Sequence, residues 1–159
     1  MADSFAEPLR RLLSGRSIAA LGTLHDGAPF VSMVPFALAE DGSAFFVHVS
    51  ALAAHTRDML ADPRVSLLVV DAESPGAPPQ ALPRLTVVGT AAQLAADSPE
   101  RSRARAFYLV RFPDAEPMFD FADFSLFAIR PTSLRWVGGF AQAQSLTPAS
   151  FAAAVRSGP

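Results

Sequence analysis

The sequence has 159 residues, half of them apolar, with 13 basic and 15 acidic side chains. This composition excludes a disordered chain, and a net charge of −2 gives no electrostatic basis for binding nucleic acid or an acidic membrane. The length suits one domain, so we expect a single domain over residues 1–159. The absence of cysteine excludes disulfides, thiolate metal sites and cysteine nucleophiles.

All basic residues are arginine, and lysine is absent. Any bound anion must therefore be held by arginine, histidine, hydroxyl groups or backbone N–H groups. The N-terminus carries acid where a signal peptide carries base, and no uncharged stretch is apolar enough to span a membrane. We therefore expect a cytoplasmic protein.

The first half of the chain predicts a helix and then a meander of three antiparallel strands. The helix is expected at 4–13, the strands at 17–24, 29–38 and 44–49, and the turns at 25–27 and 40–43. Pro35 lies within the second strand, and a proline cannot complete a hydrogen-bond ladder. This strand is therefore expected at a sheet edge or lining a site.

The second half alternates short helices with strands. Helices are expected at 50–61, from Ser98 to about Val110, and from Thr147, and strands at 65–70, 85–94, 124–129 and 133–137. Residues 71–83 form a proline-rich loop, and Gly89 predicts a bulge or bend. Six or seven antiparallel strands without βαβ alternation predict a mainly β fold, a small closed or half-open barrel.

The junction between the third strand and the following helix is the first candidate site. A helix N-terminus offers unpaired N–H groups to an anion, and Ser50, His55 and Thr56 add further donors there. A phosphate group would suit this arrangement. The alternative is structural: Ser50 caps the helix, Thr56 packs, and His55 lies at its edge.

Three other segments are candidates for a flat ligand. The backbone of the strand from Phe30 to Phe36 could bind the polar rim of a heterocycle, or the strand could be an ordinary edge. Arg84 begins a strand, where it could reach a phosphate or a partner subunit, or be solvated. Trp136 precedes two glycines and could line a ring-binding pocket or fill the barrel end.

The three histidines do not predict a metal site. His25 lies in a turn, His48 and His55 flank the start of a helix, and no H-E-x-x-H spacing occurs. Phosphate-binding glycine loops and serine-nucleophile elbows are also absent from the sequence.

Five segments in order resemble a known family. They are Asp26–Phe36, Ser50–Leu68 (with S-x-L-A-x-H-T and D-P-R-x-S-L-L), Pro83–Ala91 (P-R-L-T), Phe121–Pro131 and Val137–Ala143 (V-G-G-F). This set, within a core of about residues 14–146, resembles the pyridoxamine 5′-phosphate oxidase-like, FMN-binding split-barrel superfamily. Within it, the sequence is most similar to the haem-utilisation (haem-degrading) subgroup.

The resemblance implies a six-stranded antiparallel split β-barrel that forms a homodimer, with FMN in two clefts at the interface. It places Ser32, Met33, Val34 and Pro35 against the flavin. It places Val49, Ser50, His55 and Thr56 around the phosphate. Arg84 would reach FMN from its own or the partner subunit, and Trp136 and Phe140 would lie toward the exposed side of the cofactor.

The sequence departs from two branches of the family. The arginine–histidine pair that binds the vitamin B6 substrate has no counterpart, which argues against that activity. The C-terminal histidine that binds iron in haem-degrading relatives has none either, since no histidine follows His55. His25 or His48 would have to replace it.

These observations favour a homodimeric FMN-dependent oxidoreductase acting on an unassigned small molecule, with no catalytic side chain identified. The alternatives are a non-enzymatic protein that binds flavin or haem, and a split barrel that kept only its dimeric fold. Neither nucleic acid nor a membrane is an expected partner.

Overall fold

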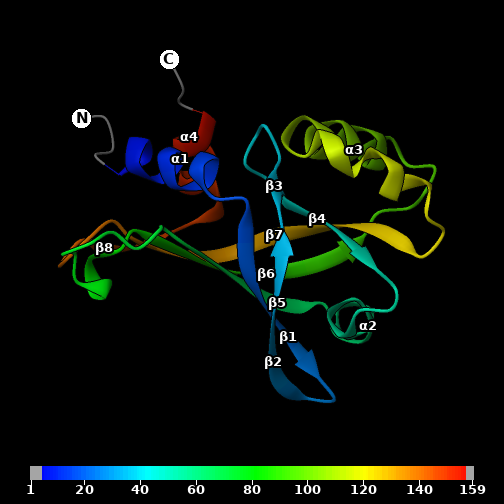
Figure 1. Cartoon of the computed structure of the whole chain (residues 1–159), viewed down its shortest axis with the longest axis horizontal. Coiled ribbons are helices and arrows are strands. Elements are labelled where there is room, and N and C mark those ends of the chain that lie inside the picture. Colours follow the sequence, from blue (N-terminus) through cyan, green and yellow to red (C-terminus); the bar gives the residue numbers. More distant parts are fainter. Residues whose placement is uncertain (1–4, 157–159) are drawn as a thin grey trace.

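The computed structural model describes residues 5–156 as a curled antiparallel sheet with helices at its margins (Figure 1). The strands are β1 (Ile18–His25), β2 (Ala28–Pro35), β3 (Ala37–Leu38), β4 (Phe45–Ser50), β5 (Arg64–Val70), β6 (Arg84–Gln93), β7 (Phe124–Val137) and β8 (Ala143–Leu146). The helices are α1 (Ala6–Gly15), α2 (Ala54–Ala61), α3 (Pro99–Arg111) and α4 (Pro148–Arg156), with 3-10 segments η1 (Pro79–Ala81) and η2 (Pro113–Asp120). The mainly β fold is confirmed, with seven to eight strands instead of six.

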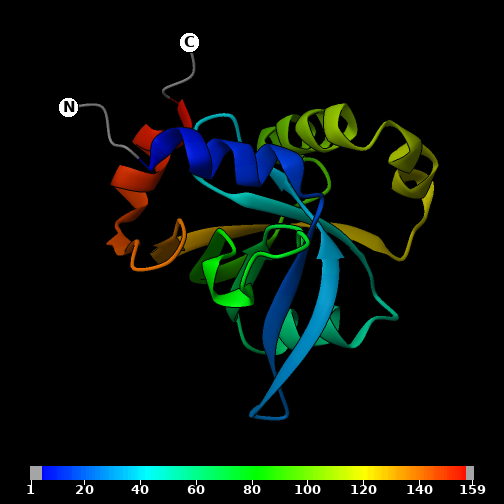
Figure 2. The ribbon, with the colours of Figure 1, turned by 60° about the vertical axis from the view of Figure 1, so that its left-hand side comes forward.

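The strand order corrects the expected meander. The sheet runs β2-β1-β5-β6-β7-β4-β3, so β2 lies at one end of the hydrogen-bonded path and β4, with β3, at the other. Pro35 ends β2 because it has no N–H to continue the ladder, and β3 pairs with β4 instead. The sheet curls into a half-barrel that brings β2 and β4 into contact. The predicted edge position of β2 is confirmed (Figure 2).

A bulge lets β7 run as one long strand where the sequence indicates two. The pairing register of β6 with β7 shifts between Val88 and Gly89, which leaves Thr132 unpaired. A Cβ at Gly89 would lie 2.5 Å from the carbonyl oxygen of Arg130, so only glycine allows this approach. The predicted irregularity at Gly89 is therefore confirmed, and it bends the sheet without interrupting it.

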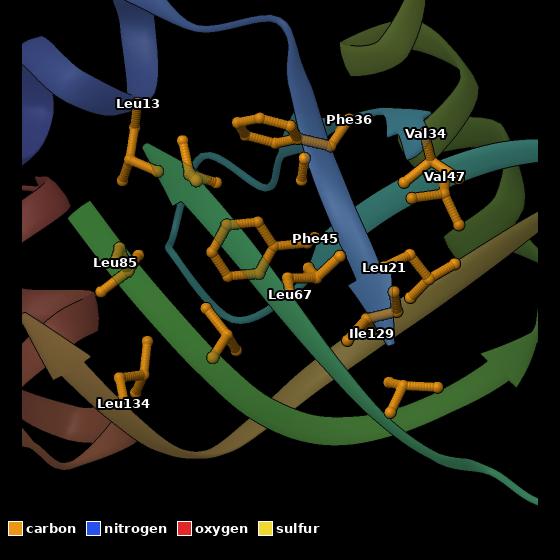
Figure 3. Close-up of a cluster of buried hydrophobic side chains, with 14 of the residues drawn as sticks. Leu13, Leu21, Val34, Phe36, Phe45, Val47, Leu67, Leu85, Ile129 and Leu134 are labelled. Atoms are coloured by element: carbon orange, nitrogen blue, oxygen red, sulfur yellow. The ribbon is translucent and has the colours of Figure 1, made fainter. Parts of the chain in front are cut away.

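The main core fills the concave side of the sheet. Alternate residues of β1, β5 and β6 point inward, as the two-residue period of a strand requires. Leu21, Phe45, Leu67 and Leu85 are among the fully buried side chains, and α1 and α4 close one end of this cluster (Figure 3).

A smaller core lies between the sheet and α3 with η2, and it contains an unusual histidine. His48 of β4 is 7% exposed, its ring stacks on Phe119 at 3.8 Å, and its edge meets Tyr108. Neither ring nitrogen has a hydrogen-bond partner among the described residues. Burial, with a smaller contribution from Arg101, lowers the pKa of His48 to about 4.

The convex face of the β2-β1-β5-β6 region is apolar and uncovered by any other described part of the chain. Paired residues place Met33 beside Ala20 and Leu68, and Val31 beside Gly22 and Ser66. The exposed large apolar residues of these strands that point to this side are Ile18, Val31, Met33, Leu68, Val70 and Val88. Such a patch on a sheet is typical of an interaction surface.

His48→Phe tests the neutral histidine of the smaller core. The unfolded chain binds a proton at this histidine below about pH 6.5, whereas the folded chain does so only below about pH 4. The wild type therefore loses about 2–3 kcal/mol of stability from this group as the pH falls through that window. Phenylalanine keeps the stacking and cannot titrate, so the variant should lose less stability.

Urea unfolding at a series of pH values between 7 and 4 measures the difference between the two proteins. Parallel curves for wild type and variant would show that His48 is not buried in its neutral form.

Candidate functional site

The start of α2 differs from the expected capped helix. The helix begins at Ala54, with Ala53 in the N-cap position and no side-chain cap, whereas Ser50 is the last residue of β4. The Ser50 hydroxyl accepts the N–H of Leu52 at 3.1 Å and donates to Asp123 Oδ2 at 2.7 Å. Ser50 therefore organises the turn before the helix and brings a carboxylate to this end.

Thr56 and Val49 are structural members of the same junction. The Thr56 hydroxyl donates to the carbonyl oxygen of Ser50 at 2.6 Å, and both Thr56 and Val49 are buried. These two side chains fix the turn, and neither presents a free polar group to a ligand.

Ser32 and His55 are brought together across β2 and α2. The Ser32 hydroxyl lies 3.0 Å from His55 Nδ1, although 23 residues separate the two in sequence. Burial lowers the pKa of His55, against a weaker opposite effect of Asp58, so the ring is neutral at pH 7. A ligand at this point would meet a neutral donor–acceptor pair.

The other β2 candidates divide between the two faces of the strand. Met33 and Pro35 are exposed on the convex side, whereas Val34 is part of the core. Because β2 is an edge strand, its outer backbone groups remain available to a ligand or to another chain.

Arg84 and Trp136 lie far from α2 in the same chain. Pro63 directly follows α2, and its carbonyl oxygen accepts the N–H of Ala91 at 2.8 Å. Arg84 precedes Ala91 by seven residues on β6, which separates these two residues by roughly 23 Å. The Arg84 guanidinium donates to the carbonyl oxygens of Gln80 and Leu82. Trp136 is buried in the core, as expected of a residue that fills the barrel end.

A buried carboxylate that the sequence did not reveal joins α2 to the β1–β2 hairpin. Asp58 is 5% exposed and accepts the Thr23 hydroxyl at 2.7 Å. Its other oxygen lies 2.7 Å from His25 Nδ1. Burial opposes the charged form of Asp58, but the hydrogen bonds from Thr23 and His25 outweigh it and lower the pKa of the carboxyl. The hydrogen bond to Asp58 and the negative charge of that carboxylate raise the pKa of His25.

The signal for this cluster was present in the sequence but weak. Thr23 and His25 are two residues apart on a strand and so share a face, and Asp58 follows His55 by three residues on a helix. Nothing in the sequence pairs these two elements with each other.

A hollow of about 400 Å³ lies between β1, β2 and β5, mainly on the convex face and so on the other side of the strands from the Asp58 cluster. Gly22, Phe30, Val31 and Ser66 are among its lining residues, with Arg64 at its edge. A Cβ at Gly22 would lie 2.6 Å from the Ser66 hydroxyl oxygen, so glycine permits the close approach of β1 to β5. The volume lies within the usual range for small-molecule pockets.

Comparisons with known proteins place the whole arrangement in a family. A profile described as pyridoxamine 5′-phosphate oxidase matches residues 5–137. The non-canonical heme oxygenase HOZ of Arabidopsis thaliana, a chloroplastic protein, is 37% identical over 86% of this chain. The match covers 41% of that protein. The heme oxygenase HutZ of Vibrio cholerae is 30% identical over 76% of this chain and 68% of its own length.

A solved structure agrees with these relatives. The heme binding protein of Mycobacterium smegmatis superposes with a TM-score of 0.83 at 34% identity, covering 96% of this chain. The chain spans 62% of that protein. Among residues 5–156, no helix is long and apolar enough to cross a membrane.

Asp58→Ala should reduce the free energy of unfolding by about 1–3 kcal/mol, because it leaves the buried Thr23 hydroxyl without its acceptor. Asp62→Ala is the control, since it removes a half-buried carboxylate whose partners, the exposed Arg64 side chain and the Arg64 N–H, remain accessible to water, and it should cost less than about 1 kcal/mol. Urea unfolding at pH 7 compares the two, and equal losses would contradict the structural role of Asp58.

Proposed function

The chain belongs to the pyridoxamine 5′-phosphate oxidase family, and from this premise we propose that it is a homodimeric haem-binding protein of the haem oxygenase type. The observation that carries the proposal is the similarity to two relatives named as haem oxygenases. One of them is 37% identical over 86% of this chain. The structurally similar mycobacterial protein is named for haem binding.

The features of this chain fit a large planar ligand with few charged contacts. The hollow between β1, β2 and β5 has an apolar lining, and the apolar convex face continues from it. Haem is mostly apolar and carries its charge on propionates at one edge. The hollow would hold the ring on the convex face, and the Ser32–His55 pair lies on the opposite face of β2.

A second copy of the chain would complete the site. Only another molecule can bury the exposed apolar face of β1, β2, β5 and β6, which favours a dimer through this face. Arg84 lies on the same four strands, at the far end from α2. Across such an interface, it would supply the cation that the α2 end lacks.

When bound, haem iron supplies the oxygen chemistry of an oxygenase, and the protein binds and orients the ring and limits access of water. Because the haem would supply the oxygen chemistry, the protein would need no acid and base side chains of the kind that hydrolases use.

FMN is the second candidate, and the observation that favours it is the group of hydroxyl and imidazole side chains at the start of α2. Ser32, Ser50, His55 and Thr56 gather there. However, Ser50 donates its proton to Asp123, so a carboxylate occupies the region where a phosphate dianion would bind. This charge weakens the case for a phosphate at the start of α2.

Titration of the purified protein with haem and, separately, with FMN tests the choice of ligand. We expect a Soret band that saturates at one haem per chain, and little quenching of flavin fluorescence at tens of micromolar. A haem-loaded protein that loses its Soret band with a reductant and oxygen is an oxygenase, and one that keeps it is a carrier. Flavin binding without haem binding would reverse the proposal.

Leu68→Glu tests the dimer. Leu68 lies on β5, one of the two inner strands of the apolar face, and is 38% exposed. A charge there should therefore convert the dimer to a monomer. Val110→Glu is the matched control, because Val110 is 83% exposed on α3, outside that face. Analytical ultracentrifugation measures both, and a monomeric wild type would contradict the proposal.

A further inference from the structure

Another hollow, of about 370 Å³, lies between α1, β3, α3 and the end of α4. It shares no residue with the hollow between β1, β2 and β5, and α1 and α3 lie on either side of β3 in Figure 1. Its volume lies within the usual range for small-molecule pockets. Most of its lining is apolar and consists of Leu13, Ala37, Leu38, Phe107, Val110 and Val155.

Two arginines are the charged side chains that line this hollow. Arg10 lies on α1 and Arg111 ends α3, and no acidic residue lines the hollow with them. Within residues 5–156, the arginines that form an ion pair with a carboxylate are Arg11, Arg64, Arg105 and Arg130. The positive charges of Arg10 and Arg111 are therefore not compensated by an ion pair in the described part of the chain.

The Arg111 guanidinium is held in position by the fold itself. Its Nη2 donates to the carbonyl oxygen of Leu13 at 3.0 Å and to that of Arg16, and the group lies 5.3 Å from the centre of the Phe36 ring. Its Nε is buried without a hydrogen-bond partner among the described residues. Burial lowers the pKa of Arg111, because the charged form loses hydration that no anion replaces.

Arg10 reaches the same hollow from α1. Its Nη1 donates to the carbonyl oxygen of Ala154 at 2.6 Å, which fixes the guanidinium between α1 and α4. Each guanidinium has five N–H donors, so both arginines keep donors beyond those that bind backbone carbonyl groups. A carboxylate would accept charge-assisted hydrogen bonds from them and compensate their charge.

A neighbouring hollow of about 780 Å³ shows why an anion would bind at the smaller one. It shares Phe107 and Val155 with the smaller hollow, but its lining includes three acidic side chains and two arginines. Its charges are therefore nearly balanced, whereas the smaller hollow has an excess of positive charge. Electrostatic attraction favours an anionic head group at Arg10 and Arg111.

We propose that the hollow between α1, β3 and α3 binds a free fatty acid in its carboxylate form. The head group would lie at Arg10 and Arg111, and the alkyl chain would lie against the apolar lining. This site is separate from the proposed haem site and does not depend on it.

Isothermal titration calorimetry of the full chain with decanoate tests the site at about pH 8, where a carboxylic acid is ionised. The ligand is kept below its micelle concentration. Wild type should bind one decanoate per chain, and Arg10→Gln should bind it at least tenfold more weakly, because the amide carries no charge. Arg11→Gln is the matched control, since Arg11 is exposed, pairs with Glu7 and does not line the hollow. It should bind decanoate as the wild type does.

Val110→Glu and Val110→Gln form a second matched pair. Val110 lines the hollow and is 83% exposed, so both variants should fold. The new carboxylate should pair with the arginines and weaken decanoate binding at least tenfold. The amide has the same shape without the charge, so Val110→Gln should bind decanoate nearly as tightly as the wild type.

The uncharged analogue 1-decanol separates recognition of the carboxylate from burial of the chain. It should bind at least tenfold more weakly than decanoate. Equal affinity for the two compounds, or no decanoate binding to the wild type, overturns the proposal. Equal weakening by Arg10→Gln and Arg11→Gln also overturns it, because only the total charge would then matter. Binding of the protein to anionic phospholipid vesicles without any decanoate binding would assign the two arginines to a membrane surface and overturn it as well.

Discussion

The central constraint on this molecule is that its curled sheet has two apolar faces and the chain covers only one of them. Inward residues such as Leu21, Leu67 and Leu85 are fully buried in the core that α1 and α4 close at one end. On the same strands, the alternate residues Leu68 and Val88 remain exposed. Burying such a surface gives roughly 25 cal/mol for each Å² removed from water, so it favours association strongly. The proposed dimer and the proposed ligand site follow from this one asymmetry.

The second determinant is the carboxylate of Asp58. A charge that is 5% exposed is expensive unless hydrogen bonds compensate it, and Thr23 and His25 supply them. These bonds attach α2 to the β1–β2 hairpin and so fix where His55 meets Ser32. The position of the Ser32–His55 pair therefore depends on Asp58, which lies within the family-like segment Ser50–Leu68.

The electrostatics of the α2 end bear on the choice between ligands. Helix N-termini attract anions, but here Asp123 accepts the Ser50 hydroxyl, and burial keeps His55 neutral. A phosphate dianion needs more positive charge than this end offers.

The sequence by itself determined the elements that local chemistry controls. Alternating apolar residues predicted most strands, Pro35 predicted an edge strand, Gly89 predicted the bulge, and Ser98 predicted the start of α3. Each of these follows from a backbone restriction at one residue or from a period of two. The ordered motifs also identified the family.

Only the tertiary structure decided which elements are neighbours. The strand order separates β2 from β4. The contact of Ser32 with His55 and the grouping of Thr23 and His25 with Asp58 join residues that are 23 to 35 positions apart in the sequence. The helix expected from Ser50 begins at Ala54 because Ser50 completes a strand and ties the turn to Asp123. Such pairings depend on how the sheet curls, and no local pattern records that curvature.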